Sequence, residues 1–315
     1  MVRFKVLLAA LGLAASAISL PAQAGYYSAL YAFGDSLSDN GASLLASSLN
    51  PPAAPTPRTS DGPVFVEYIA QALGLTLNDY AVGGARSDTA NSDIPSGELA
   101  NSGLLAQVEQ FRLNVADVAD PLALYFVSGG SNDVLDAIAS QDLSDPAVLD
   151  GLVNSLVGNL SAAVQQLYDI GARHFVLPLL PNLGLTPEAA GQGLAADLTA
   201  LSLGINSVLA DSYALLFADK PDAQVLVYDA YAKQTSILAS PVDHGLANGT
   251  DACLDQPGVS DCSSFFFWDS LHPTAAASHL LAADVLAAMG VPEPATLLLA
   301  AGGLLLVIGR RHRRA

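Results

Sequence analysis

The sequence has 315 residues, with 30 acidic against 12 basic side chains and a formal net charge of −18 at neutral pH. Between residues 25 and 291, 29 acidic residues face only six basic ones, so this part alone carries about −23. Such a negative field repels nucleic acid and anionic lipid, and it excludes a nucleic-acid-binding function. The about 267 residues of this part suffice for one large α/β domain with a full hydrophobic core.

The first 24 residues have the pattern of a signal peptide. Two basic residues near the start precede an apolar stretch over residues 6–20, and Ala22-Gln23-Ala24 supplies the small side chains of a cleavage site. A retained membrane anchor is the alternative, but the apolar stretch is shorter than the ~20 residues that a span requires. We therefore expect the mature chain to begin near Gly25.

Apolar strand-like segments then alternate with helical patterns, which indicates an α/β domain with a largely parallel sheet. The helix expected over residues 146–170 is the best delimited, since Asp145 can cap it, a proline opens it and Gly171 ends it. In chain order, the expected elements are a strand at 29–33, a helix at 63–73, a strand at 75–82, a helix at 103–113, a strand at 122–128, the 146–170 helix, a strand at 174–179, a long helix at 187–217 that can break near Gly204, a strand at 224–228 and a helix at 273–289.

Ser36 is the strongest candidate for chemistry. It follows the first strand within Phe33-Gly34-Asp35-Ser36-Leu37, where the glycine and the polar residues after it predict a tight turn. A hydroxyl becomes a nucleophile when an imidazole takes its proton and a third group orients the imidazole. Asp269 and His272, directly before the last helix, can supply both groups. In open α/β sheets such residues meet at the carboxyl ends of the strands.

Four residue blocks resemble the GDSL, or SGNH, hydrolase family in order and content, over almost all of residues 28–289. The resemblance implies a flavodoxin-like three-layer α/β/α sandwich around a mostly parallel five-stranded sheet. The blocks are Phe33-Gly34-Asp35-Ser36-Leu37-Ser38-Asp39-Asn40-Gly41, Tyr80-Ala81-Val82-Gly83-Gly84-Ala85, Ser128-Gly129-Gly130-Ser131-Asn132-Asp133 and Asp269-Ser270-Leu271-His272-Pro273.

The same resemblance assigns roles to individual residues. It makes Ser36 the nucleophile, His272 its base and Asp269 the group that orients the imidazole. It builds an oxyanion hole from the backbone N–H of Ser36, a glycine N–H and the side-chain amide of Asn132. We align the glycine with Gly84; its neighbour Gly83 is the alternative. A glycine is expected there because a side chain would crowd the approach of the substrate to the backbone.

Other polar residues have simpler explanations. Ser36 alone could cap a turn, and Asp35, Asp39, Asn40 and Asp133 are expected to stabilise turns or accept structural hydrogen bonds. The histidines at 174, 244 and 279 lack partners in the sequence and are expected to be structural. No ligand set at metal spacing is found, so we expect neither a metal nor another cofactor.

Cys253 and Cys262 are the only cysteines and lie nine residues apart in a polar loop. In an exported chain this spacing favours a disulfide, which would contribute about 2–3 kcal/mol on the chain-entropy model. A metal site is the competing interpretation, but no histidine lies at ligand spacing from both cysteines.

Residues 291–315 form a second targeting signal. Val291-Pro292-Glu293-Pro294 is followed by an apolar run over 295–309 and a terminal arginine cluster. The segment resembles the PEP-CTERM sorting signal of Gram-negative bacteria, which implies an exosortase as partner and a destination at the cell surface or in the extracellular matrix. A plain single-pass anchor is the alternative.

The sequence therefore predicts an exported serine esterase or lipase that forms an acyl-enzyme. Its substrate could be a lipid ester, a short acyl ester or an acetylated polysaccharide. A non-catalytic surface or matrix binding protein on the same scaffold, and an acyltransferase, are the competing functions. A protease is disfavoured because no pocket for a peptide side chain is evident.

Overall fold

Five short strands form a central sheet in the computed structural model, which describes residues 26–49 and 52–291. Their order is β2-β1-β3-β4-β5 and every neighbouring pair is parallel. This is the doubly wound order of flavodoxin-like proteins, so the predicted fold class is confirmed. The strands are β1 (Leu30–Phe33), β2 (Leu77–Asp79), β3 (Leu124–Val127), β4 (His174–Pro178) and β5 (Gln224–Tyr228).

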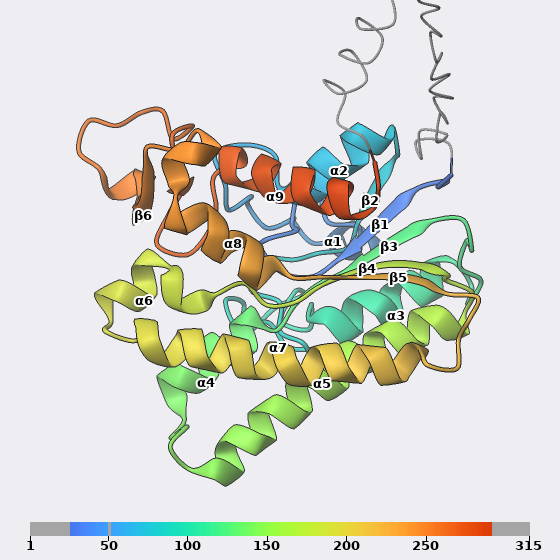
Figure 1. The fold of residues 1–315 in the computed structure, drawn as a ribbon. Coiled ribbons are helices and arrows are strands. Elements are labelled where there is room, and N and C mark those ends of the chain that lie inside the picture. Colours follow the sequence, from blue (N-terminus) through green and yellow to red (C-terminus); the bar gives the residue numbers. More distant parts are fainter. Residues whose placement is uncertain (1–25, 50–51, 292–315) are drawn as a thin grey trace, which may run out of the picture.

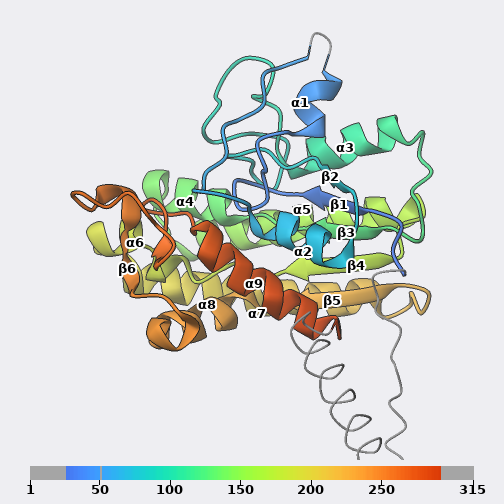
Figure 2. The ribbon, with the colours of Figure 1, turned by 90° about the horizontal axis from the view of Figure 1, so that it is seen from above.

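Helices cover both faces of the sheet and make three layers (Figure 1). Helices α2 and α9 lie side by side over one face, while α3, α5 and α7 cover the other (Figures 1 and 2). The helices are α1 (Leu44–Ser48), α2 (Phe65–Leu73), α3 (Leu104–Asn114), α4 (Ser131–Ser140), α5 (Pro146–Asp169), α6 (Pro187–Gly191), α7 (Ala195–Phe217), α8 (Ala230–Ala239) and α9 (Ala275–Ala288).

Successive side chains of a strand point to opposite faces of the sheet, so the hydrophobic core has one part on each face. In β1, Leu30 and Ala32 face α2 and α9, whereas Phe33 joins the aromatic cluster beneath α3. Helices α5 and α7 are long and apolar enough to cross a membrane by length and composition, with a mean hydropathy of 1.4. Their apolar faces pack against the sheet instead, as core helices do.

The structure corrects two predicted elements. Of the predicted 75–82 strand, β2 keeps only Leu77–Asp79, although Tyr80 and Val82 still donate their N–H groups to the Ala32 and Gly34 carbonyls at 2.8 and 3.2 Å. The predicted 187–217 helix is two helices, but the break falls at residues 192–194 and not near Gly204, which lies inside α7. Gly193 has a φ of +72°, a left-handed conformation that a continuous helix does not contain.

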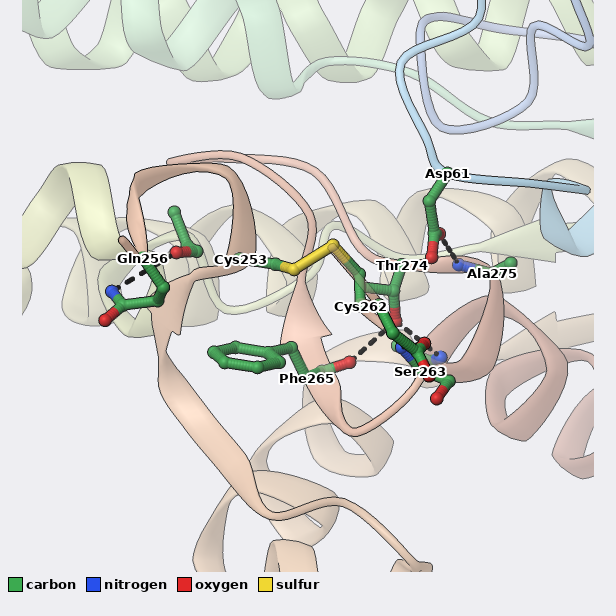
Figure 3. Close-up of a disulfide and its surroundings, with 11 residues drawn as sticks. Asp61, Cys253, Gln256, Cys262, Ser263, Phe265, Thr274 and Ala275 are labelled. Carbon is green, nitrogen blue, oxygen red and sulfur yellow. Dashed lines mark hydrogen bonds between the residues drawn. A yellow bond between two sulfur atoms is a disulfide. The ribbon is translucent and has the colours of Figure 1, made fainter. Parts of the chain in front are cut away.

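A small two-stranded ribbon precedes the last helix. Strands β6 (Asn248–Ala252) and β7 (Phe265–Phe267) pair in parallel, and a disulfide joins Cys253 to Cys262 beside them (Figure 3). The predicted disulfide is thus present. The predicted signal peptide and the sorting tail from residue 292 on lie outside the described residues.

Candidate active site

The turn that carries Ser36 is fixed by one buried glutamine. Gln107 on α3 accepts a hydrogen bond from the Gly34 N–H at 2.8 Å and donates its amide to the Gly34 carbonyl at 2.7 Å. A Cβ at Gly34 would stand 2.5 Å from the Ser128 hydroxyl, so only glycine fits between β1 and β3. Gln107 was missed by the sequence analysis, although an amide on the apolar face of a helix was a signal for it.

The structure brings together the three residues expected to form the catalytic triad. The Nε2 of His272 lies 2.8 Å from the Ser36 Oγ, across 236 positions of sequence. The Nδ1 of the same ring lies 2.8 Å from Oδ2 and 3.0 Å from Oδ1 of Asp269. The hydroxyl, imidazole and carboxylate therefore form one hydrogen-bonded chain, with the imidazole in the middle.

The Asp269 carboxylate is held by its own loop. Its Oδ1 accepts the backbone N–H groups of Leu271 at 2.8 Å and His272 at 2.6 Å. Burial opposes ionisation of this carboxyl, but the hydrogen bonds and charge of His272, together with these backbone donors, lower the pKa of Asp269 below its ordinary value. The group is therefore suited to remain ionised beside the imidazole.

Two peptide groups beside Ser36 are oriented through their carbonyls. The Asp35 carbonyl accepts the N–H groups of Ser38 and Asp39, both at 3.0 Å. The Gly83 carbonyl accepts the Asn91 side-chain amide at 2.7 Å. In a trans peptide the C=O and the N–H point in opposite directions. The bonds to the Asp35 carbonyl therefore turn the Ser36 N–H away from Ser38 and Asp39, and the bond to the Gly83 carbonyl turns the Gly84 N–H away from Asn91.

The geometry favours Gly84 over Gly83 as an oxyanion donor. The Gly83 N–H already donates to the Asp39 carboxylate at 2.8 Å. Gly84 has a φ of +76°, and a Cβ there would stand 2.5 Å from Asn91 Oδ1. The glycine is thus required by its backbone conformation and by the closeness of Asn91.

The third expected donor, Asn132, is the second residue of helix α4 and lines the same cavity as Ser36. Its Nδ2 donates to the Ala85 carbonyl at 2.8 Å, which fixes the direction of the amide; an amide nitrogen carries a second N–H besides the one used in this bond. The next residue, Asp133, accepts the backbone N–H of Ser87 at 2.8 Å and its hydroxyl at 2.6 Å. This is the structural role expected for Asp133.

A loop over residues 56–63 ties the serine turn to the histidine loop. Thr59 donates its hydroxyl to the Ser36 carbonyl at 3.1 Å, and Ser60 donates to the Pro273 carbonyl at 3.1 Å. Asp61 accepts the N–H of Ala275, the first residue of α9, at 2.6 Å (Figure 3). Sequence analysis missed these contacts, because nothing local relates the loop to a helix more than 200 residues away.

The disulfide ribbon supports the histidine loop from the other side. The Leu254 N–H donates to the carbonyl of Trp268, the residue before Asp269, at 3.0 Å. The Thr274 hydroxyl donates to the Phe265 carbonyl at 2.7 Å, next to the Cys253–Cys262 bridge (Figure 3). Asp269 and His272 thus lie on a loop that is fixed at both ends.

A mostly apolar cavity opens beside Ser36, His272 and Asn132. It continues past the residues that follow β4 to the end of β5 and the first turns of α8. Three of its walls come from Leu179–Leu180, from Phe266–Phe267 and from Leu281. A substrate carbonyl at Ser36 therefore has an apolar space next to it.

The remaining histidines lie away from this chemistry. His279 packs edge-on against Tyr68 with 5.1 Å between ring centroids, and His174 contacts Tyr26 and Tyr27 in the same manner. Within residues 26–49 and 52–291, no group of three or more His, Cys, Asp or Glu side chains is arranged to hold a metal ion.

Fold and site together define a class: doubly wound α/β/α proteins with a hydrogen-bonded Ser–His–Asp constellation at the carboxyl ends of the strands. Residues 30–285 match the model of the GDSL-like lipase/acylhydrolase family, and the chain belongs to this family. Residues 290–314 match the PEP-CTERM protein-sorting motif. Both resemblances drawn from the sequence are thus confirmed.

Three curated relatives are similar to this chain over most of its length. An uncharacterized protein from the trpE-trpG intergenic region of Pseudomonas putida is 30% identical over 92% of this chain and 53% of its own length. The thermolabile hemolysin of Vibrio parahaemolyticus is 27% identical over 81% of this chain and 62% of its own length. Esterase EstA of Pseudomonas aeruginosa is 28% identical over 93% and 52%. The chain spans about half to three-fifths of these relatives.

Two solved structures are similar to this chain. The lipase Lip_vut3 from a goat rumen metagenome is similar to this chain at 17% identity, with 83% of this chain and 97% of the lipase covered and a TM-score of 0.48. Est24, a carbohydrate acetylesterase from Sinorhizobium meliloti, is similar at 15% identity, with 83% and 99% covered and a TM-score of 0.45.

Proposed function

We propose that this protein is a serine esterase that hydrolyses carboxylic esters through an acyl-enzyme on Ser36. The observation that carries the proposal is the hydrogen-bonded chain from the Ser36 Oγ through His272 to Asp269, with 2.8 Å at each of its two junctions. Membership of the GDSL-like lipase/acylhydrolase family and the similarity to esterase EstA support the same chemistry.

In the first half of the reaction, Ser36 Oγ attacks the ester carbonyl carbon while His272 Nε2 takes the serine proton. Negative charge then develops on the carbonyl oxygen, where the N–H groups of Ser36, Gly84 and Asn132 can donate to it. As the tetrahedral intermediate collapses, His272 returns the proton to the departing alcohol. The acyl group stays on Ser36.

In the second half, water replaces the alcohol beside His272. The imidazole takes a proton from this water, the resulting hydroxide attacks the acyl carbon, and Ser36 recovers its proton as the carboxylic acid leaves. Asp269 stabilises the imidazolium that forms in both halves and holds its Nδ1–H, which fixes the tautomer.

The nucleophile is tested with Ser36→Ala. We expect kcat on p-nitrophenyl esters to fall by about 10⁴-fold or more, because no other side chain supplies the attacking oxygen. A serine-reactive phosphonate should label Ser36 in the native protein, as located by mass spectrometry of the peptides. Ser131→Ala is the matched control, since that hydroxyl lines the same cavity without contacting His272.

Retained turnover in a folded Ser36→Ala variant, or phosphonate on another residue, would remove the proposal. A native protein that binds esters without turning them over would indicate the non-catalytic alternative. Products analysed with and without an added acceptor alcohol separate hydrolysis from acyl transfer.

The sorting motif indicates export in a Gram-negative bacterium by a chain with a membrane-anchoring C-terminal tail. We further propose that residues 1–24 are a cleaved signal peptide, 25–290 the hydrolase domain and 291–315 the tail that an exosortase recognises. The enzyme then reaches the cell surface or extracellular matrix. N-terminal sequencing and cell fractionation of the full-length protein test this organisation.

A further inference from the structure

The cavity beside Ser36 carries information on the substrate that the catalytic residues do not. Polar residues line it near the catalytic serine, and elsewhere only Thr186, Tyr228 and Gln234 add polar side chains to a mostly apolar lining. Away from the serine, its walls are side chains of β7, α8, α9 and the segment after β4, chiefly Leu179, Leu180, Ala230, Phe266, Phe267 and Leu281. Phe266 and Phe267 are buried, so this wall of the cavity belongs to the hydrophobic core.

The chemistry of these walls disfavours a polar occupant. In the part of the chain that the structure describes, no Lys or Arg side chain lines the cavity. The Asn182 N–H engages the Gln234 Oε1 at 2.7 Å, and the Leu183 carbonyl engages the Thr186 hydroxyl at 2.8 Å. Among the described residues the buried Tyr228 hydroxyl is without a partner, which is one group for the several hydroxyls of a sugar. Sugar hydroxyls placed there would lose water without gaining enough partners, whereas methylene groups gain by leaving water.

The order of the reaction decides which side of an ester enters the cavity. The acyl group stays on Ser36 until water attacks it, while the alcohol must leave early and be replaced by that water beside His272. A recess within the core retains the group that stays and would hinder the exit of the group that leaves. The acyl chain therefore belongs in the cavity and the alcohol on the open side.

We propose that this cavity is an acyl-chain site and that the protein prefers esters of fatty acids several carbons long over acetyl esters. The proposal rests on the proposed esterase function and specifies its substrate class. Ala230, the half-buried first residue of α8, is a specificity-determining residue because its small side chain leaves part of the cavity open.

The first experiment uses two ester series with the native protein. In one, the acyl group of p-nitrophenyl esters is lengthened from acetyl through butyryl and hexanoyl to octanoyl and dodecanoyl. We expect kcat/KM to rise about fourfold per methylene until the cavity is filled. In the other, acetyl esters of alcohols of increasing length should show a much weaker dependence.

The second experiment changes the cavity in opposite directions. Ala230→Leu should lower kcat/KM for the octanoyl ester by about tenfold and change that for the acetyl ester by less than about threefold. Leu281→Ala should shift the preferred acyl chain to greater length. Ala232→Leu is the matched control, because Ala232 is exposed on the same helix and does not line the cavity.

The outcomes separate this proposal from the one it rests on. Hydrolysis of the acetyl ester without a gain for longer acyl chains would overturn the acyl site and leave the esterase function standing. A chain-length dependence confined to the alcohol series would assign the cavity to the leaving group instead. Turnover of no ester would overturn both. The native series decides between these outcomes even where a variant fails to fold.

Discussion

At the scale of single residues, the site depends on side chains that touch no substrate. Gln107 fixes the Gly34 peptide, and Asn91 fixes the Gly83 carbonyl so that the Gly84 N–H is turned away from it. Asp39 occupies the N–H of Gly83. These contacts decide which backbone donors remain free, and free donors of fixed direction are what a developing oxyanion needs.

Asn132→Ala tests the side-chain donor. We expect kcat to fall by about 10²–10³-fold with little change in KM, because the amide is used mainly when negative charge develops on the carbonyl oxygen. Steady-state kinetics on one ester and a thermal unfolding curve measure both effects. Asn154→Ala, an exposed position on α5, serves as control. A fall confined to KM would contradict the oxyanion role.

At the scale of elements, the active site joins the two ends of the described chain. The serine turn follows β1, the histidine loop precedes α9, and both are tied to the loop over residues 56–63. The distance from hydroxyl to imidazole thus depends on this loop as well as on the sheet. The position of α9 depends on it too, since Asp61 receives the first N–H of that helix.

Asp61→Ala tests this connection. Loss of the acceptor at the start of α9 should lower the free energy of unfolding by about 1 kcal/mol, as loss of a helix cap does, and should lower kcat/KM because His272 is held less firmly. Denaturant unfolding and ester kinetics measure the two effects. Asp61→Asn keeps an acceptor oxygen and should restore both. A variant with native stability and native kinetics would show that the contact is dispensable.

At the scale of the whole molecule, an acidic domain also buries several carboxyl groups. Burial raises the pKa of Asp35, Asp39 and Asp133, and that of Asp79 lies well above its ordinary value of 3.8. Asp79 still accepts the N–H groups of Asn40 and Ala81, each at 2.9 Å. The fold thus retains buried acids whose ionisation it opposes.

The sign of the pH dependence follows from these shifts. Between the ordinary pKa of an aspartate and the raised values, the folded protein binds more protons than the unfolded chain, so the free energy of unfolding increases as the pH falls through this window. Asp269, with its lowered pKa, acts in the opposite sense at still lower pH, and His174, whose pKa burial lowers from its ordinary 6.5, acts in the opposite sense below that value, as one group against four.

Urea unfolding at neutral pH and at about pH 5 measures this dependence. We expect the native protein to be more stable at the lower pH and Asp79→Asn to have a weaker dependence. Asp150→Asn, at an exposed position, should leave the dependence unchanged. Greater stability of the native protein at neutral pH would contradict the prediction.

The sequence by itself determined the five strands of the sheet, the disulfide partners and the three residues that the structure brings into one hydrogen-bonded chain; helices α4 and α8 and the β6–β7 ribbon were not predicted. Strong local signals carry the predicted features: the apolar strands, the cap and stop of α5, the Gly34–Ser36 turn and the short spacing of Asp269 and His272. The sequence carries only weak signals for the length of β2 and for the break before α7. The length of a strand and the ends of a helix depend on the segments that pack against them in space.

Only the tertiary structure decided which glycine N–H is free, which loop holds the site together and where an apolar cavity lies. The proposed donor at Gly84 depends on Asn91 and Asp39, and the loop depends on the start of α9. The cavity exists where β4, β5, β7, α8 and α9 meet. These features arise from contacts between segments far apart in the chain. A local sequence pattern predicts only the structure of residues that are close together in the sequence.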